Sequence, residues 1–297
     1  METCSSRLKP ESCLFGLTDS PNRYDNKTWA AGTRVALRVE YNGSVFHGWQ
    51  AQPHLSVATV QETLETALSQ IANCDVRTHC AGRTDTGVHG FGQIVHFDDP
   101  VGRSAKAWVM GTNSALPDTV RVHWAAAVAP DFHARFTATA RRYRYIIANT
   151  PVRPAHLSGL VSWYRRPLDV AVMAEGAKHL LGEHDFSAFR AAQCQANSPN
   201  RCISRLDVWR RGDFVVLEIE ANAFLHHMVR NIAGSLQMVG AGFQPPHWIA
   251  QLLEGRDRTK AADTASGTGL YLVAVTYPDN YALPATPEGP ALLTGFV

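Results

Sequence analysis

Residues 81–90 carry the sequence Ala-Gly-Arg-Thr-Asp-Thr-Gly-Val-His-Gly. Strand-like apolar patterns flank this segment at residues 76–80 and 92–97, so we predict a loop between two strands. The glycines of the loop allow positive φ values and a close approach of a ligand to the backbone. The loop also gathers three ionisable side chains, Arg83, Asp85 and His89. Because an aspartate in a loop often caps backbone N–H groups, Asp85 is at this point either a structural or a catalytic residue.

The loop does not have the sequence of a phosphate-binding P-loop, since its glycines lack the G-x-x-x-x-G-K-[ST] spacing and no lysine follows. A metal centre is also disfavoured. His89 and His96 lack the spacing of an H-E-x-x-H motif. His226 and His227 fall in a predicted helix, where adjacent side chains point about 100° apart and would rarely bind one ion. We therefore expect no metal and no cofactor.

Strand and helix signals alternate in the first half of the chain. Residues 34–41 alternate apolar and polar side chains, as a strand does, and Asn42-Gly43 marks a turn. Thr59 and Glu62 form a capping box ahead of a helix whose apolar residues recur at 3.6-residue spacing. A helix over 104–116 and a strand over 120–128 complete this unit.

The second half of the chain repeats the alternation. Strands are predicted at 141–148, 203–210, 213–221 and 270–277, and Arg211-Gly212 marks a hairpin turn. Asp169 caps a helix that reaches residue 181, and further helices are predicted at 225–239, 247–253 and 259–265. These patterns predict an α+β fold of two similar domains, each with a mostly antiparallel sheet that helices cover on one face.

The predicted domain boundaries follow from these elements. Residues 1–33 are predicted to be a disordered N-terminal extension, because they lack periodicity and are rich in Ser, Pro and Asn. Residues 34–132 form the N-terminal domain, which contains the loop 81–90. Residues 133–285 form the C-terminal domain, and residues 286–297 are a tail.

The composition of the 297-residue chain is that of a folded protein, with 45% hydrophobic and 18% charged residues and a formal net charge of +2. No apolar run reaches the ~18–20 residues of a membrane span. Charge is concentrated between residues 132 and 167, where arginines occur without any acid. These arginines are Arg135, Arg141, Arg142, Arg144, Arg153, Arg165 and Arg166. Aromatic residues are interleaved with them, which favours a nucleic-acid partner over a merely solvated face.

The cysteines and the N-terminus are typical of a cytoplasmic protein. The six cysteines include no C-x-x-C pair, so we expect free thiols instead of zinc ligands or disulfides. Acidic residues interrupt the N-terminal segment, and it contains no apolar core of a signal peptide. We expect a cytoplasmic location and no contact with a membrane.

Residues 82–89 resemble the signature loop of the TruA family of tRNA pseudouridine synthases, G-R-T-D-x-G-V-H. Further resemblances follow in order from about residue 34 to 285. They are Tyr41-x-Gly43-x4-Gly48-Trp49-Gln50, Phe-His-Ala-Arg-Phe at 132–136, Ala-Arg-Arg-Tyr-Arg-Tyr at 140–145, Phe-Leu-His-His-Met-Val-Arg-Asn at 224–231 and Gly-Leu-Tyr-Leu at 269–272. The resemblance implies an isomerase that converts uridine to pseudouridine at positions 38, 39 and 40 in the anticodon stem-loop of tRNA, without a cofactor.

The resemblance also implies roles for individual residues. Asp85 would be the catalytic aspartate, and Arg230 the arginine that holds its carboxylate. Tyr143 would stack on the flipped uracil and remove the proton from C5, and Leu270 would pack on the base. Arg83 would occupy the space that the flipped nucleotide leaves in the stack.

The same resemblance implies a homodimer that holds a tRNA across both subunits, with an RNA cleft between the two domains. Because neighbouring target positions are accepted, we expect shape and phosphates to be recognised more than base edges. Arg141, Arg142 and Arg144 are the predicted phosphate contacts. Two alternatives stay open, namely a catalytically silent tRNA-binding protein on the same fold and a metal-dependent hydrolase that uses Asp85.

Overall fold

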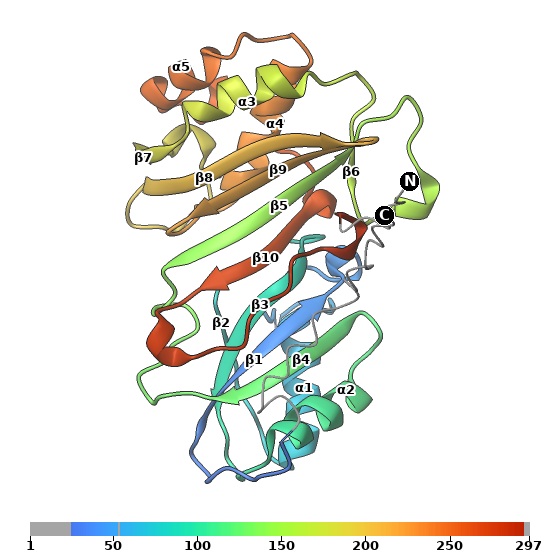
Figure 1. The fold of residues 1–297 in the computed structure, drawn as a ribbon, viewed down its shortest axis with the longest axis vertical. Helices are drawn as coiled ribbons and strands as arrows, with labels where there is room; N and C mark the ends of the chain where they lie inside the picture. Colours follow the sequence, from blue (N-terminus) through green and yellow to red (C-terminus); the bar gives the residue numbers. More distant parts are fainter. Residues whose placement is uncertain (1–24, 53, 294–297) are drawn as a thin grey trace, which may run out of the picture.

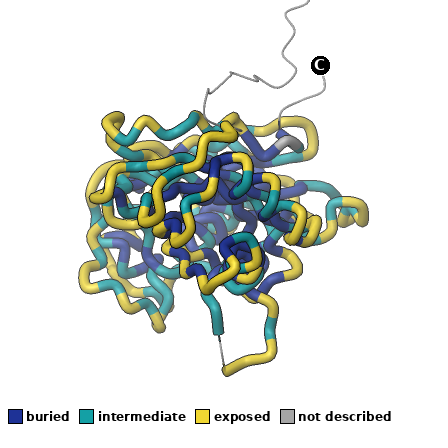
Figure 2. Tube along the Cα trace, turned by 90° about the horizontal axis from the view of Figure 1, so that it is seen from below, coloured by how far each residue is buried: buried dark blue, intermediate teal, exposed yellow. Residues whose placement is uncertain are grey.

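This computed structural model describes residues 25–52 and 54–293. Within them, ten strands form one sheet (Figure 1). The strands follow the order β4-β1-β3-β10-β5-β9-β8-β7, with β2 added to β3 and β6 to β5. The predicted α+β class with mostly antiparallel strands is confirmed. Buried segments run through the middle of the molecule, and exposed segments form the loops around it (Figure 2).

The N-terminal half contributes four strands and a helical layer. Its strands are β1 (Arg34–Tyr41), β2 (His79–Cys80), β3 (His89–Asp98) and β4 (Val120–Ala127), and its helices are α1 (Val60–Ala72), a π-helical turn (Ala107–Gly111) and α2 (Thr112–Ala115). Thr59 caps α1 as predicted, since its side chain accepts from the backbone N–H of Glu62 and donates to the Glu62 carboxylate. Leu64 and Leu68 of α1 are fully buried and pack in one core with Leu37 of β1.

The C-terminal half contributes six strands and three α-helices. Its strands are β5 (Ala140–Ala148), β6 (Ser162–Trp163), β7 (Gly182–Asp185), β8 (Asn200–Arg211), β9 (Phe214–Ala221) and β10 (Leu270–Thr276), and its helices are α3 (Val170–Lys178), α4 (Met228–Gly240) and α5 (Trp248–Gly255). Asp169 caps α3 as predicted, by accepting from two backbone N–H groups. The predicted hairpin is also confirmed, because β8 and β9 pair antiparallel up to Arg211 and Phe214.

Short 3₁₀ turns complete the described chain. They are Gly43–Val45, Ala155–Leu157, Ser187–Phe189, Arg258–Lys260, Gly267–Gly269, Asp279–Tyr281 and Ala291–Leu293. The helix predicted over 259–265 is therefore wrong apart from one turn. The strand predicted over 76–80 is likewise reduced to β2.

The two halves share one sheet, whereas the sequence predicted a sheet for each domain. Strand β10 joins them: it pairs antiparallel with β5 and parallel with β3, the latter through Tyr271 opposite His89 and Leu272 opposite Gly90. In Figure 1, β10 lies between β3 and β5, in the middle of the sheet. The loop 81–90 leads directly into β3, so this junction places the loop beside the C-terminal half.

Helices cover one face of the sheet, and the segment after β10 crosses the other face (Figure 1). On that second face, Leu293 is buried against Ile146, Val216 and Tyr271. The Arg144 guanidinium donates to the carbonyl oxygen of Gly289 at 2.6 Å. The predicted tail 286–297 is thus packed on the sheet up to residue 293, and residues 294–297 lie outside the described range.

Ordered contacts also begin before the predicted start at Arg34. The backbone N–H of Trp29 donates to Arg103, and that of Gly32 donates to Asp99. Trp29 packs against the core of the N-terminal half. The predicted disordered extension is therefore wrong for residues 25–33, and its remainder, residues 1–24, lies outside the described range.

Candidate active site

The last residue of β1 and the segment between β1 and α1 hold the loop 81–90 in place. The Tyr41 hydroxyl lies 2.8 Å from the Thr84 hydroxyl in a buried hydrogen bond. The backbone N–H of Trp49 donates to the carbonyl oxygen of Thr84 at 3.0 Å. Gly48 has φ +88°, and a Cβ built there would lie only 2.8 Å from the same carbonyl oxygen. These contacts fix the residue that precedes Asp85.

His89 closes the far end of the loop. The backbone N–H of Gly43 donates to its Nδ1 at 3.1 Å, so Nε2 carries the proton and donates to the carbonyl oxygen of Thr268 at 3.1 Å. Burial lowers the pKa of His89, which keeps the imidazole neutral. His89 therefore ties the loop to the turn before β10.

The first residues of the loop are held by side chains from the neighbouring strands. The Gln93 amide accepts from the backbone N–H of Gly82 at 3.4 Å and donates to its carbonyl oxygen at 2.6 Å. Arg141 donates through Nη2 to the carbonyl oxygen of Ala81 at 3.2 Å. With both ends and the middle fixed, the loop presents Asp85 from a rigid support.

Asp85 is paired with Arg230, as predicted. Nη1 of Arg230 lies 3.1 Å from Oδ2 of Asp85, and the Arg230 Nε donates to the carbonyl oxygen of Ala265 at 2.8 Å. Both side chains are mostly buried, with 16% of Arg230 and 25% of Asp85 exposed. Arg230 lies in the first turn of α4, so this helix orients the carboxylate.

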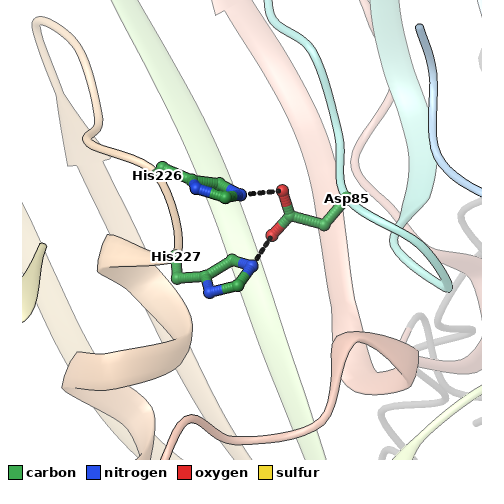
Figure 3. Close-up of side chains that lie close together, drawn as sticks. All are labelled: Asp85, His226 and His227. Carbon is green, nitrogen blue, oxygen red and sulfur yellow. Dashed lines mark ion pairs between the residues drawn. The ribbon is translucent and has the colours of Figure 1, made fainter. Parts of the chain in front are cut away.

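Two histidines, His226 and His227, also face Asp85. Figure 3 shows both rings pointing at the carboxylate from the turn ahead of α4. Nε2 of His226 lies 3.4 Å from Oδ1, and Nε2 of His227 lies 3.4 Å from Oδ2. The prediction that these adjacent side chains diverge is wrong, because α4 begins at Met228, three residues later than predicted. His227 has φ 61°, a left-handed conformation that turns both rings to the same side.

The charge of His227 depends on its surroundings. Burial lowers the pKa of His227, while the neighbouring Asp85 carboxylate opposes that shift and the Arg230 guanidinium adds to it.

The turn that carries His226 is fixed by its backbone: the N–H of His226 donates to Sγ of Cys194 at 3.4 Å, and its carbonyl oxygen accepts from the N–H of Ala191 at 3.0 Å.

Tyr143 and Leu270 lie on the helical face of the sheet near this cluster. A Cβ built at Gly82 would lie 3.6 Å from the Tyr143 hydroxyl oxygen. Burial raises the pKa of Tyr143, and the Asp85 charge raises it further, so the side chain is a neutral phenol. Leu270 is 5% exposed and belongs to the same apolar core as Tyr143.

The predicted RNA-contacting arginines occupy different positions. Arg83 is exposed in the loop, two residues before Asp85. Arg141 donates to four backbone carbonyl oxygens, those of Ala138, Asn222, Ala81 and Arg135. These contacts hold the guanidinium within the fold and give no support to Arg141 as a phosphate contact.

Arg142 and Arg144 point to the opposite face of β5 from Tyr143, because side chains alternate along a strand. Arg144 is 9% exposed and forms an ion pair with the buried Glu218. Nη1 of Arg142 lies 3.9 Å from the same carboxylate. The alternation therefore separates both guanidinium groups from Asp85, and their ion pairs with Glu218 give no support to the prediction that they contact phosphates.

Sequence reasoning missed Gln93, His226 and His227 as parts of the site. Gln93 lies among apolar residues of β3 and is fully buried, and a lone glutamine in a strand gives no signal for its partner. The histidine pair did give a signal, since it stands three residues before Arg230. Because the helix was predicted to start at Leu225, the two side chains were expected to diverge, and this signal was not recognised.

Neither a membrane-spanning helix nor a second group of metal-ligand side chains occurs in the part of the chain that the structure describes. No helix there is long and apolar enough to cross a bilayer. Asp85, His226 and His227 are the one set in these residues whose potential ligand atoms lie within 4.8 Å of one another.

Comparison with known proteins identifies the class of this fold and site. The family model described as tRNA pseudouridine synthase matches residues 37–137 and 177–278, a segment in each half of the chain. The chain belongs to the tRNA pseudouridine synthase family. It is therefore an isomerase that converts uridine to pseudouridine in tRNA.

Several relatives are similar over most of their length. The tRNA pseudouridine synthase A of Idiomarina loihiensis is 58% identical over 260 residues, which cover 88% of this chain and 99% of the relative. The proteins of the same name from Photobacterium profundum and Escherichia coli are each 55% identical over 260 residues, or 88% of this chain, and are covered to 99% and 96%. Among solved structures, a Cbf5-Nop10-Gar1 complex matches with a TM-score of 0.32 and 13% identity, covering 80% of this chain and 48% of that chain.

Proposed function

We propose that Asp85 performs the isomerisation and that its pairing with Arg230 prepares it to do so. The 3.1 Å contact between Arg230 Nη1 and Asp85 Oδ2 is the observation that carries this proposal. A charged hydrogen bond of this kind fixes the orientation of the carboxylate through one of its oxygens. The supports at Thr84 and His89 reduce the motion of the loop, so the carboxylate is oriented before the RNA binds.

The reaction requires few catalytic groups besides one carboxylate. The N1–C1′ bond of uridine breaks, the uracil turns, and a C5–C1′ bond forms. The proton on C5 leaves and N1 gains one, so atoms and charge balance without a redox step or a group donor. Asp85 would act in one of three ways: attack at C1′, attack at C6, or removal of a proton from the sugar.

Tyr143 and Leu270 would form the support for the extruded uracil. Because the buried Tyr143 is a neutral phenol, its ring favours stacking on the base. Removal of the C5 proton by Tyr143 would require the phenol to pass its own proton to another base, because a neutral phenol is not itself a base. Leu270 adds an apolar contact from the start of β10.

The target uridines would lie at positions 38, 39 and 40 of the anticodon arm. A base within a stem must leave the stack before a carboxylate reaches its sugar. The exposed Arg83 is close enough in sequence to Asp85 to enter the vacated space. We further propose a homodimer that binds the anticodon arm of tRNA across both subunits, and a cytoplasmic location where such tRNA is found.

The test is an assay of purified protein with unmodified tRNA and EDTA, followed by mapping of pseudouridine. We expect conversion at positions 38, 39 and 40 by the wild type and none by Asp85→Asn, which keeps the size of the side chain. Binding of tRNA should stay within a few-fold. Asp118→Asn is the matched control, because this exposed aspartate pairs with Arg121 and not with a residue of the loop.

Three outcomes would contradict the proposal. If Asp85→Asn retains a tenth of wild-type turnover, Asp85 is not the catalytic residue. Tight binding of tRNA by the wild type without any pseudouridine would indicate a silent binding protein. Release of free uracil only when a metal is added would indicate a hydrolase.

A further inference from the structure

We infer that Asp85, His226 and His227 form a capture site for a divalent transition metal, and that a bound ion of this class blocks the enzyme. The ion would be an inhibitor and not a part of the isomerisation. The inhibitory effect rests on the proposed role of Asp85, whereas binding of the ion does not. The inference starts from the convergence of three side chains that Figure 3 shows.

The distances in this cluster fit shared coordination better than hydrogen bonding. The two imidazole Nε2 atoms each lie 3.4 Å from a carboxylate oxygen, beyond the ~2.7–3.2 Å usual for a hydrogen bond. Two ligands of a tetrahedral zinc, each bonded at about 2.0–2.1 Å, lie roughly 3.3–3.4 Å apart. The ligand atoms of all three residues lie within 4.8 Å of one another, so small side-chain rotations bring them onto one ion.

The ligand set selects the class of ion. Two imidazoles and one carboxylate suit zinc, nickel or cobalt, whereas magnesium and calcium prefer sets made of oxygen. The side chains are also accessible, with 37% of His226, 28% of His227 and 25% of Asp85 exposed. The buried His89, by contrast, uses both ring nitrogens within the fold.

The backbone holds the two histidines in place without an ion. His226 is fixed through Cys194 and Ala191, and the carbonyl oxygen of His227 accepts from the N–H of Asn231 at 2.9 Å within the first turn of α4. The left-handed φ of His227 aims both rings at the carboxylate. A prearranged ligand set lowers the cost of ordering side chains when the ion binds.

Arg230 opposes the ion. Its Nη1 lies 3.1 Å from Oδ2 of Asp85, so a cation bound to this carboxylate has a guanidinium as its neighbour. Like charges at such distances repel. Arg230 therefore keeps the affinity low and reserves the carboxylate for the substrate, and its removal should strengthen metal binding.

The experiment is calorimetric titration of the full chain with zinc chloride in a buffer that does not bind metals. The wild type should bind one ion that is lost or weakened at least tenfold in Asp85→Asn, His226→Ala and His227→Ala. Arg230→Met should bind the ion several-fold more tightly. His179→Ala is the control and should keep the wild-type affinity, because His179 is an exposed histidine outside the cluster.

Isomerisation supplies the second measurement. Zinc, and not magnesium, should inhibit the wild type, EDTA should restore it, and tRNA bound beforehand should slow the uptake of zinc. Unchanged zinc affinity in the three ligand variants, or lost affinity in His179→Ala, would overturn the inference. If the alanine variants do not fold, His226→Asn and His227→Asn replace them. Failure of the proposed function is distinguishable, because it would leave the calorimetric result intact.

Discussion

Arg230 contacts Asp85 and Ala265 with one guanidinium, through Nη1 at 3.1 Å and Nε at 2.8 Å. This single side chain connects α4, the loop 81–90 and the segment before β10. A change at Arg230 thus alters the orientation of the carboxylate without touching the loop itself.

Two substitutions at Arg230 should separate its charge from its shape. Arg230→Lys keeps the charge and loses the planar fork, so we expect kcat to fall about tenfold. Arg230→Met loses both, and kcat should fall at least a further tenfold, while tRNA affinity changes little. Single-turnover kinetics with saturating enzyme measures the effect, and Arg103→Met, at an exposed arginine, is the control. Wild-type turnover by Arg230→Met would show that the pairing has no role in the reaction.

Gly48 provides a test of the support beneath Asp85. Gly48→Ala places a Cβ 2.8 Å from the carbonyl oxygen of Thr84 and imposes a left-handed φ of +88° on alanine. We expect a loss of about 1–2 kcal/mol in the free energy of unfolding from the backbone alone, together with a large drop in kcat. Gly212→Ala is the matched control, because φ there is +54° and nothing lies within 4 Å of the added atom. Equal activity losses in both variants would exclude a specific role for the contact with Thr84.

Arg141 should contribute to stability more than to RNA affinity. Arg141→Ala removes hydrogen bonds to four carbonyl oxygens, including that of Ala81 at the start of the loop. We expect unfolding to become easier by about 1–3 kcal/mol and kcat to decrease. The slope of log affinity for tRNA against log salt should stay the same. A slope that flattens by about one unit would instead identify Arg141 as a phosphate contact.

The histidine group around His96 predicts a pH-dependent stability. Burial lowers the pKa of His96 to about 4, and the neighbouring His133, His79 and Arg34 add to this, against the opposing charge of Asp98. As the pH falls below the usual value near 6.5, the unfolded chain takes up this proton first, so the folded state loses stability down to about pH 4.

Chemical unfolding at pH 7.5 and pH 5 measures this effect. We expect the free energy of unfolding to be roughly 2 kcal/mol lower at pH 5 on account of His96. His96→Asn keeps an acceptor near the backbone N–H of Ala134, which Nδ1 of His96 binds at 3.1 Å, and should reduce the difference between the two pH values. An equal difference in both proteins would assign the effect to other groups.

Local sequence signals predicted most elements correctly, since their causes lie within a few residues. Thr59 and Asp169 cap their helices by contacts to neighbouring N–H groups, and the hairpin turns at Gly212 and Asp213, one residue after the predicted Arg211-Gly212. The merger of the two sheets has no local cause. It depends on two residue pairs between β3 and β10, which are far apart in the chain.

In the candidate site, too, some features were predicted from the sequence and others depend on contacts that the sequence does not show. Asp85 and Arg230 were predicted through a family resemblance, and the structure places them in contact. The histidine pair was missed because helix periodicity was extended to Leu225, whereas a left-handed residue at His227 delays the helix. No alternation pattern predicts positive φ at a histidine, because this conformation is set by the contacts of the turn.

Strand β10 is synthesised last among the strands but occupies the middle of the sheet. Until residues 270–276 leave the ribosome, β5 lacks its partner along residues 140–145 and β3 lacks one at His89 and Gly90, so both strands present unpaired N–H and C=O groups. Such open edges pair readily with other chains. A nascent chain that stalls before Leu270 would therefore expose two edges at once, and production of this enzyme depends on the prompt arrival of its final strand.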